Sequence, residues 1–207
     1  SRIGHMILRL GLLSAFVCLS VAGWAGVFHN VRDYGAKGDG STKDTAAVQA
    51  AIDAASDGYV ICLCCDATFS GDGNQNIDLG GKAITVRSEC GDAERCTIDC
   101  QGSGNMRRAF YFHSAEGASS VVRDVTIANG YVKYPYAGGG VHCSNAASPT
   151  IDGCRIINCQ ATSGGGIFVA AGCSPTISHC TISGNYATYG GGLYGALQFA
   201  HCAITGN

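Results

Sequence analysis

Hydrophobic and polar positions recur with a fixed period in the second half of the chain. Gly-Gly-Gly triplets begin at Gly138, Gly164 and Gly190, so their spacings, 164 − 138 and 190 − 164, are both 26 residues. A second motif follows in the same frame, with an apolar residue, then cysteine three positions later and isoleucine two after that: Ile151/Cys154/Ile156, Ile177/Cys180/Ile182 and Phe199/Cys202/Ile204. A constant period of this length predicts stacked repeats, that is, a solenoid.

Weaker copies of the second motif extend the series upstream. Val122, Val125 and Ile127 form one copy, and Ala93, Cys96 and Ile98 form a fainter one. The third position of each copy precedes that of the next by 29 residues (127 − 98 and 156 − 127). At least five related units are therefore expected, which predicts about five to six coils for the whole chain.

The segments around the glycine triplets distinguish two kinds of solenoid. A leucine-rich repeat has the same apolar spacing before an asparagine, but its return segment is commonly helical. Here the return segment has glycine triplets followed by alternation, with Ile167 and Val169 on one face and Phe168 on the other. This alternation predicts strands. The fold expected is an all-β parallel β-helix with about three short strands per unit, in which five isoleucines point inward: Ile151, Ile156, Ile177, Ile182 and Ile204.

One amphipathic helix is expected before the coils. Residues 45–55 place five apolar side chains on one face: Ala47, Val48, Ala51, Ile52 and Ala55. Asp44 or Thr45 is the expected N-cap, and Gly58 is expected to end the helix in a left-handed conformation. Since the end of a solenoid exposes apolar side chains and strand edges, this helix is expected to cap the N-terminal end. We therefore divide the mature chain into a signature loop and capping helix at 26–58 and coils at 59–207. The sequence offers no matching cap at the other end, where it stops in mid-coil, which favours a fragment of a longer protein.

The first 25 residues are typical of an export signal. From Met6 to Ala25 the chain has one arginine, then an apolar run, then small residues at Gly23 and Ala25, which is the pattern of a cleavable secretory signal peptide. Residues 1–5 are interpreted as a leader before the true start. A short membrane anchor is the alternative, but the apolar run of about 16 residues is shorter than the ~20 needed to cross a bilayer. We expect a secreted or cell-surface protein with no stable membrane span after cleavage.

Composition narrows the expected partners. The chain has 31 glycines and 3 prolines, which favours turns and strands over long helices. Its 13 basic and 15 acidic residues give a net charge of −2, which provides no electrostatic basis for binding nucleic acid or an anionic membrane surface.

Thirteen cysteines require an explanation in a chain expected to be exported. Removal of the signal peptide takes Cys18 and leaves twelve. Cys154, Cys180 and Cys202 hold the same place in successive repeats, and in-register parallel side chains are poorly aimed for the disulfide dihedral angle near 90°. They are therefore predicted to form a ladder of buried free thiols. For Cys62, Cys64 and Cys65 a local disulfide or buried thiols are both expected ahead of a zinc site.

Two segments resemble known families. The stretch from Asn30 to Ile52, which contains Asp-Tyr-Gly-Ala-Lys-Gly-Asp-Gly, resembles the N-terminal signature of pectate lyase superfamily β-helix proteins, shared with polygalacturonase-like hydrolases and phage tailspike-like proteins. Residues 77–207 are similar to secreted bacterial right-handed parallel β-helix repeat proteins and to the repeats of polymorphic outer-membrane adhesins. The resemblance implies a right-handed parallel β-helix with a polysaccharide or cell-wall glycan as partner. It does not by itself imply catalysis.

Candidate catalytic groups are few. The chain lacks the aspartate-containing strings and the Gly-His-Gly of polygalacturonase-like hydrolases, and after residue 110 its only carboxylates are Glu116, Asp124 and Asp152. Asp124 and Asp152 could flank a glycosidic bond as a pair. Alternatively, Asp124 and Asp152 could bind Ca²⁺ while Arg155 acts as the base of a polysaccharide lyase. No resident metal or cofactor is otherwise expected.

The strongest candidate for glycan binding is a column of aromatic residues. His142, Phe168 and Tyr194 occupy equivalent outward positions after the three glycine triplets, and His113 is a possible fourth member. Such a column either binds sugar rings or stabilises the sheet by side-chain stacking. Two functions remain open: a polysaccharide-active enzyme such as a lyase or hydrolase, and a non-catalytic adhesin or structural β-helix that binds glycans.

Overall fold

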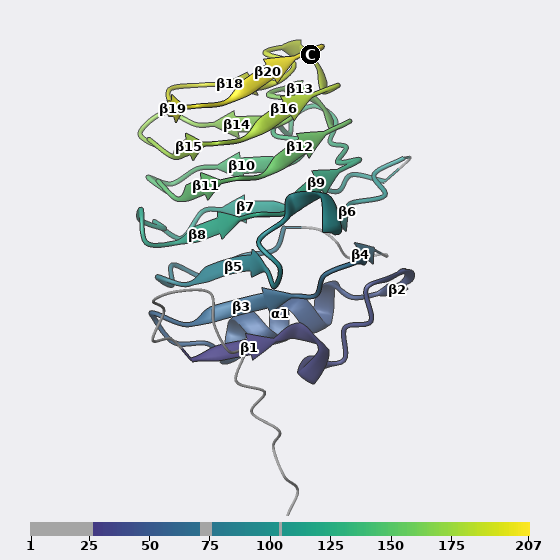
Figure 1. The fold of residues 1–207 in the computed structure, drawn as a ribbon. Helices are drawn as coiled ribbons and strands as arrows, with labels where there is room; N and C mark the ends of the chain where they lie inside the picture. Colours follow the sequence, from purple (N-terminus) through teal and green to yellow (C-terminus); the bar gives the residue numbers. More distant parts are fainter. Residues whose placement is uncertain (1–26, 71–75, 104) are drawn as a thin grey trace, which may run out of the picture.

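The computed structural model describes residues 27–70, 76–103 and 105–207. The expected signal peptide lies outside these residues. Within them the chain forms a parallel β-solenoid of about 6 turns with one α-helix near the N-terminus, which confirms the predicted fold class (Figure 1). No helix in the described ranges is long and apolar enough to cross a membrane.

Each sheet of the solenoid takes one strand from successive coils, and every pair of neighbouring strands is parallel. Sheet A contains β1 (Phe28–Asn30), β3 (Val60–Leu63), β5 (Thr85–Ser88), β8 (Val121–Arg123), β11 (Thr150–Asp152), β15 (Thr176–Ser178) and β19 (Gln198–Ala200). Sheet B contains β2 (Asp39–Lys43), β4 (Ala67–Ser70), β6 (Cys96–Asp99), β9 (Thr126–Ala128), β12 (Arg155–Ile157), β16 (Thr181–Ser183) and β20 (Ala203–Thr205).

Two smaller sheets complete the later coils. Sheet C contains β7 (Phe110–Phe112), β10 (Val141–Cys143), β14 (Ile167–Val169) and β18 (Leu193–Tyr194). Sheet D contains β13 (Gln160–Ser163) and β17 (Tyr186–Tyr189). The chain therefore passes through sheets A, B, D and C in turn, and the glycine triplets form the corner between D and C.

Rows of apolar side chains from the same position in successive coils form the core. In sheet B, Ile98, Ile127, Ile156 and Ile182 lie in register and are buried. Ile204 continues this row, as predicted for an inward position, but is 40% exposed because it belongs to the last described strand of sheet B and is covered from one side only.

The faint upstream repeat is only partly correct. In sheet A the row of Ile177, Ile151 and Val122 continues to Val86, whereas Ala93 lies in the 3-10 helix η2 (Ala93–Arg95). An insertion between β5 and β6 separates the two halves of this motif. Sequence spacing alone therefore assigned the wrong residue to the row.

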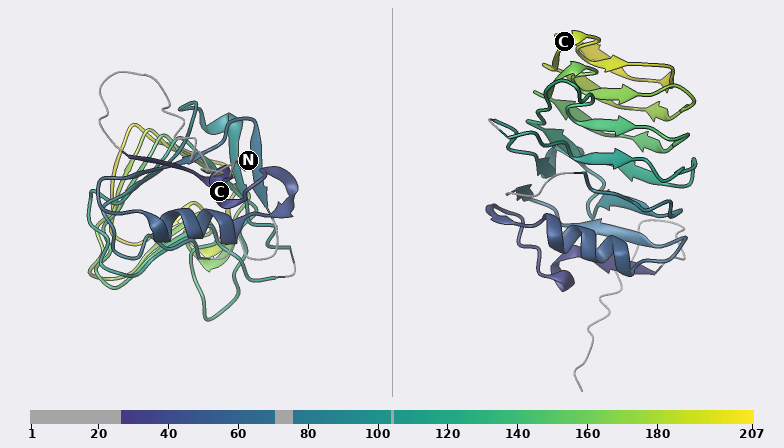
Figure 2. Two further views of the ribbon diagram at one scale, coloured as in Figure 1. Left: turned by 90° about the horizontal axis from the view of Figure 1, so that it is seen from below. Right: turned by 180° about the vertical axis from the view of Figure 1, so that it is seen from behind.

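The helix α1 (Thr45–Ala54) lies across the N-terminal end of the solenoid (Figure 2). Its buried residues Val48, Ala51 and Ile52 join the core, as predicted for a cap. Asp44 is the N-cap residue, as predicted, but the expected hydrogen bonds from its side chain to the first helical amides are not formed. The Asp44 carboxylate makes no hydrogen bond to the helix and instead accepts from the backbone amides of Lys37 and Gly38, at 2.8 and 2.9 Å.

The C-terminal end of α1 is also formed differently from the prediction. The helix is capped by Ala55 in an extended conformation, and Gly58, with φ of 82°, belongs to the following turn. The Lys82 ammonium, from a neighbouring coil, donates to the carbonyls of Ile52 and Asp53 at 2.8 and 2.7 Å. A cation at this position complements the helix dipole, which the local sequence could not reveal. A second 3-10 helix, η1 (Val31–Tyr34), precedes β2.

Most cysteines serve as core residues. Among the described residues one disulfide joins Cys65 to Cys90, and Cys154, Cys180 and Cys202 are free thiols. Cys154 and Cys180 are each 1% exposed, and burial raises the pKa of the Cys154 thiol well above its ordinary value. The predicted ladder of free thiols is confirmed, with Cys202 only partly buried at its end.

Candidate functional site

Four rings lie in contact in one line along the outer surface of sheet C. The register places Tyr111 beside His142, His142 beside Phe168, and Phe168 beside Tyr194. The corresponding ring centroids are 5.1, 4.9 and 5.6 Å apart. We call these four residues the aromatic column.

The fourth member of the aromatic column is Tyr111 rather than His113, which corrects the sequence prediction. Phe110 lies beside Val141, so the outward position next to His142 is Tyr111. His113 lies two residues further along, with its ring centroid 4.3 Å from that of Tyr111 and its Nε2 3.3 Å from a carboxylate oxygen of Asp78. The alternation of Phe110 and Phe112 around Tyr111 was the signal that would have identified this residue.

Glycine backbone borders the aromatic column on one side. The glycine strip consists of residues 138–140, 164–166 and 190–192. A Cβ atom on Gly165 would lie 2.5 Å from the carbonyl oxygens of both Gly191 and Tyr186, so successive coils approach too closely there for any other residue. Gly164 has φ of 59°, and a Cβ on it would lie 2.8 Å from the Cα of Phe168. The glycine strip therefore leaves the flank of the rings free of side chains.

The stacking limits which ring surfaces remain for a ligand. The rings of Phe168 and Tyr194 are parallel to within 3°, so they cover each other's faces and stabilise the sheet. Tyr194 is 46% exposed, and His142 and Phe168 are partly exposed. A ligand on this surface therefore contacts ring edges, the phenol groups and the outer face of Tyr194.

His142 is a neutral member of the aromatic column. Its Nδ1 donates a hydrogen bond to the carbonyl of Ala137 at 2.8 Å. Burial, aided by the nearby Arg108 charge, outweighs this bond and lowers the pKa of His142 to about 4. At neutral pH the imidazole of His142 is therefore uncharged.

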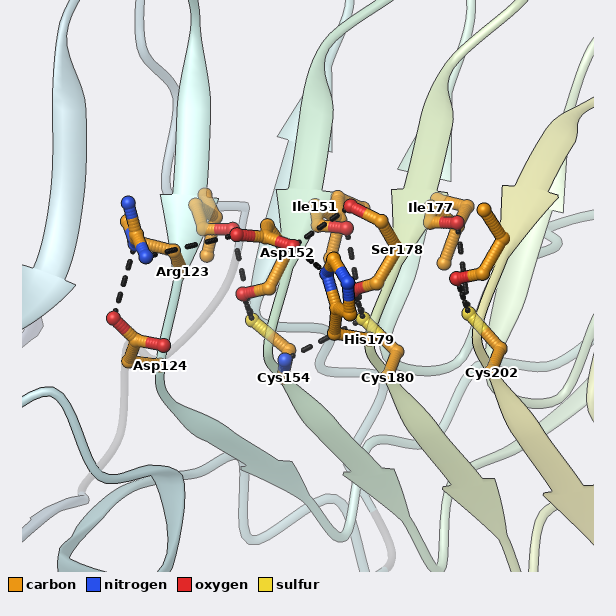
Figure 3. A network of polar contacts seen from close by, with 12 residues as sticks. Arg123, Asp124, Ile151, Asp152, Cys154, Ile177, Ser178, His179, Cys180 and Cys202 are labelled. Carbon is orange, nitrogen blue, oxygen red and sulfur yellow. Dashed lines mark hydrogen bonds and ion pairs between the residues drawn. The ribbon is translucent and has the colours of Figure 1, made fainter.

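A second cluster of polar residues lies on sheet A and the adjoining turn (Figure 3). Arg123 contacts the carboxylates of both Asp124 and Asp152, with N–O distances of 3.0 and 3.7 Å. Asp152 also accepts hydrogen bonds from the Ser178 hydroxyl at 2.7 Å and from His179 Nδ1 at 2.8 Å. The structure thus brings Asp124 and Asp152 together around one arginine.

The third predicted member of a lyase site lies elsewhere. Arg155 is on β12 in sheet B and contacts Glu94 at 3.3 Å. The base-plus-calcium arrangement drawn from Asp124, Asp152 and Arg155 is therefore wrong as a single site. Across the ranges that the structure describes, no three or more His, Cys, Asp or Glu residues are grouped so as to hold a metal ion.

Residues from different coils shift the protonation of Asp152. Partial burial raises the pKa of Asp152, but the hydrogen bonds from His179 and Ser178 and the charge of Arg123 outweigh it, so the net pKa is below the ordinary value. His179 itself has φ of 52° in the turn after β15, and its ring stacks on that of His201 with centroids 5.2 Å apart. An ionised Asp152 bonded to Nδ1 fixes the tautomer of His179 that has Nε2 as the basic nitrogen.

Comparisons with known proteins match both parts of the chain. The family described as right-handed β-helix region matches residues 60–207, and the family described as rhamnogalacturonase A/epimerase, pectate lyase-like, matches residues 28–68. No curated protein sequence gives a significant match. Among solved structures, ORF18 of Geobacillus virus E2 is similar at 15% identity with a TM-score of 0.33. That alignment covers 75% of this chain and 42% of the viral protein, so the chain spans less than half of that protein's length.

Proposed function

The chain belongs to the right-handed β-helix family, with a pectate lyase-like N-terminal segment, and on this basis we propose that it binds a polysaccharide along the aromatic column of sheet C. A single observation carries the proposal: Tyr111, His142, Phe168 and Tyr194 form one continuous line beside a strip of bare glycine backbone. Tyrosine and histidine present both an apolar ring and a polar group, which suits the mixed surface of a sugar chain.

The N-terminal sequence supports a role outside the cell. Polysaccharides of cell walls and cell surfaces meet proteins that are exported, and the sequence of residues 6–25 has the pattern of a secretory signal. We therefore propose a secreted or cell-surface protein, with binding as its main activity.

Affinity electrophoresis tests the proposed binding. Wild-type protein is run through gels that contain a neutral or an acidic polysaccharide, beside Phe168→Ala, Tyr194→Ala and the control Tyr186→Ala. Tyr186 is a suitable control because it is 67% exposed but lies on β17 of sheet D, outside the aromatic column. We expect retardation to fall about fivefold or more in the two column variants, which corresponds to ~1 kcal/mol, and to stay at the wild-type value in Tyr186→Ala. Equal retardation of all four proteins would exclude the aromatic column as the binding surface.

A second candidate function, polysaccharide cleavage, is favoured by the Asp152–His179 pair. A carboxylate that orients an imidazole is one arrangement that supplies a general base. Incubation with polygalacturonate, with and without Ca²⁺, followed by measurement of unsaturated ends and reducing sugars, distinguishes the two functions. We expect little product. Product that is lost in Asp152→Ala and His179→Ala but kept in Arg155→Ala would instead assign cleavage to this pair.

A further inference from the structure

Arg108 occupies an unusual place beside the aromatic column. It precedes Phe110 by two residues, as Gly139 precedes Val141, and Phe110 and Val141 are partners in the sheet. Arg108 therefore stands in its coil where the later coils have the middle glycine of the glycine strip. The glycine strip is thus followed by the guanidinium group of Arg108 at the end of the aromatic column formed by Tyr111.

Arg108 is a largely buried residue with no carboxylate partner among the described residues. The residue is 7% exposed, and its Cζ lies 5.3 Å from the centroid of the Tyr111 ring. In residues 27–70, 76–103 and 105–207, no Asp or Glu forms an ion pair with it. Burial lowers its pKa, while the neighbouring phenols Tyr111 and Tyr136 raise it. Arginine nonetheless keeps its charge at neutral pH.

A buried positive charge of this kind is costly unless something compensates it. A ring face stabilises such a charge less than a hydrogen-bonded anion does. His142, which lies next to Tyr111 in the aromatic column, is neutral at pH 7 and gives no negative charge. The surroundings of Arg108 therefore favour a negatively charged oxygen group from outside the chain.

We propose that Arg108 is an anion subsite at the end of the aromatic column and binds a carboxylate or sulfate group of an acidic glycan. The planar guanidinium can donate two parallel hydrogen bonds to such a group, while the neighbouring sugar contacts Tyr111 and the rings beyond it. This inference rests on the proposed function, because it assigns the class of polysaccharide that the aromatic column binds.

The test compares acidic and neutral polymers on variants of the same surface. Affinity electrophoresis is performed with polygalacturonate for carboxylates, dextran sulfate for sulfates and dextran as a neutral polymer. The proteins are wild type, Arg108→Gln, Arg108→Lys, Tyr194→Ala and the control Arg155→Gln, whose arginine is paired with Glu94 on sheet B. Circular dichroism and thermal melting establish that each variant is folded, and Arg108→Lys keeps the charge if the glutamine variant does not fold.

We expect Arg108→Gln to weaken binding of one acidic polymer at least tenfold and to leave dextran binding unchanged, with Arg108→Lys between the two. The polymer affected identifies carboxylate or sulfate as the bound group. Equal loss for acidic and neutral polymers, or no loss in Arg108→Gln, overturns the anion subsite and leaves Arg108 as packing for Tyr111. If the wild-type protein binds dextran but neither acidic polymer, the anion subsite is overturned and the proposed function stands. Failure to bind any polymer overturns both.

Discussion

His142 and Asp152 each owe their protonation behaviour to residues from other parts of the solenoid. Burial on the outer surface of sheet C keeps His142 neutral, whereas Ser178 and His179 from the next coil help to keep Asp152 ionised. The Asp152 shift arises because stacking places side chains 26 and 27 residues apart in the sequence within hydrogen-bonding distance, whereas the His142 shift arises mainly from burial. The contribution of such a titrating residue is therefore best tested by measuring how the free energy of unfolding depends on pH.

We predict that His142→Phe reduces the loss of stability in acid. The folded pKa of about 4 lies below the ordinary 6.5, so between these values the unfolded state binds more protons and the free energy of unfolding falls as the pH is lowered. Phenylalanine keeps a ring in contact with Tyr111 and Phe168 and removes the titrating group. Urea unfolding at about pH 7 and about pH 4.5 should give a smaller difference for the variant than for wild type. An identical difference would contradict the lowered pKa.

The cysteines give a second prediction for single residues. Alkylation of unfolded protein without reduction, followed by mass spectrometry, should find Cys65 and Cys90 linked and Cys154, Cys180 and Cys202 modified as free thiols. Parallel rungs bring these three residues close together but aim their Cβ–Sγ bonds poorly for a disulfide. A Cys154–Cys180 link in most molecules would contradict this interpretation.

At the scale of secondary structure, the glycine strip and the buried asparagine control how closely coils stack. Asn185 is 2% exposed; its side chain accepts from the Cys159 amide and donates to the Ile156 carbonyl, both at 2.9 Å. Asn207 repeats the second of these bonds one coil later, to the carbonyl of Ile182. Turns that would otherwise leave backbone groups unpaired are thereby bonded from coil to coil.

The glycine strip should be intolerant of any side chain. We expect Gly165→Ala to lower the free energy of unfolding by about 3 kcal/mol, since its Cβ would meet two backbone oxygens at 2.5 Å. Gly117→Ala is the matched control, because no atom lies within 4 Å of its Cβ position, and it should stay within about 1 kcal/mol of wild type. Denaturant unfolding of both variants provides the measurement. Similar values for the two would show that the coils separate easily at the D–C corner.

For the molecule as a whole, the two ends of the solenoid differ. The N-terminal end is covered by α1, whose buried face extends the core (Figure 2). At the other end, Phe199 and Ile204 are 60% and 40% exposed on the last described strands. Because the coils touch only their neighbours, stability is close to a sum along the stack, and α1 contributes to it at the N-terminal end.

We predict that Ile52→Asp uncovers the N-terminal end, whereas Ala50→Asp does not. Ile52 is 1% exposed and packs in the core, while Ala50 is exposed on the same helix. Burying an unpaired carboxylate in place of isoleucine should cost about 3 kcal/mol or more and promote aggregation through the freed strand edges. Size-exclusion chromatography and thermal melting of the two variants check this. Equal behaviour would show that α1 is dispensable for the stack.

The sequence alone determined the architecture, because an apolar pattern that repeats at a fixed period is buried by stacking the repeats on one another. The 26-residue spacing and the alternation around Phe168 were enough to identify the parallel stack and its inward rows, and the amphipathic pattern of residues 45–55 identified the capping helix, observed at Thr45–Ala54. Each of these features depends on local periodicity, which the chain carries in every coil. The positions of His142, Phe168 and Tyr194 in one line follow from the same periodicity.

Only the tertiary structure decided which irregular residues meet. Arg155 pairs with Glu94 and lies apart from Asp124 and Asp152, and Cys65 joins Cys90. Insertions of different length in the early coils shift the register, so spacing no longer tells which side chains are neighbours. The burial of Arg108 against Tyr111 and the hydrogen bond from His179 to Asp152 are properties of the stacked coils, so the sequence could not reveal them.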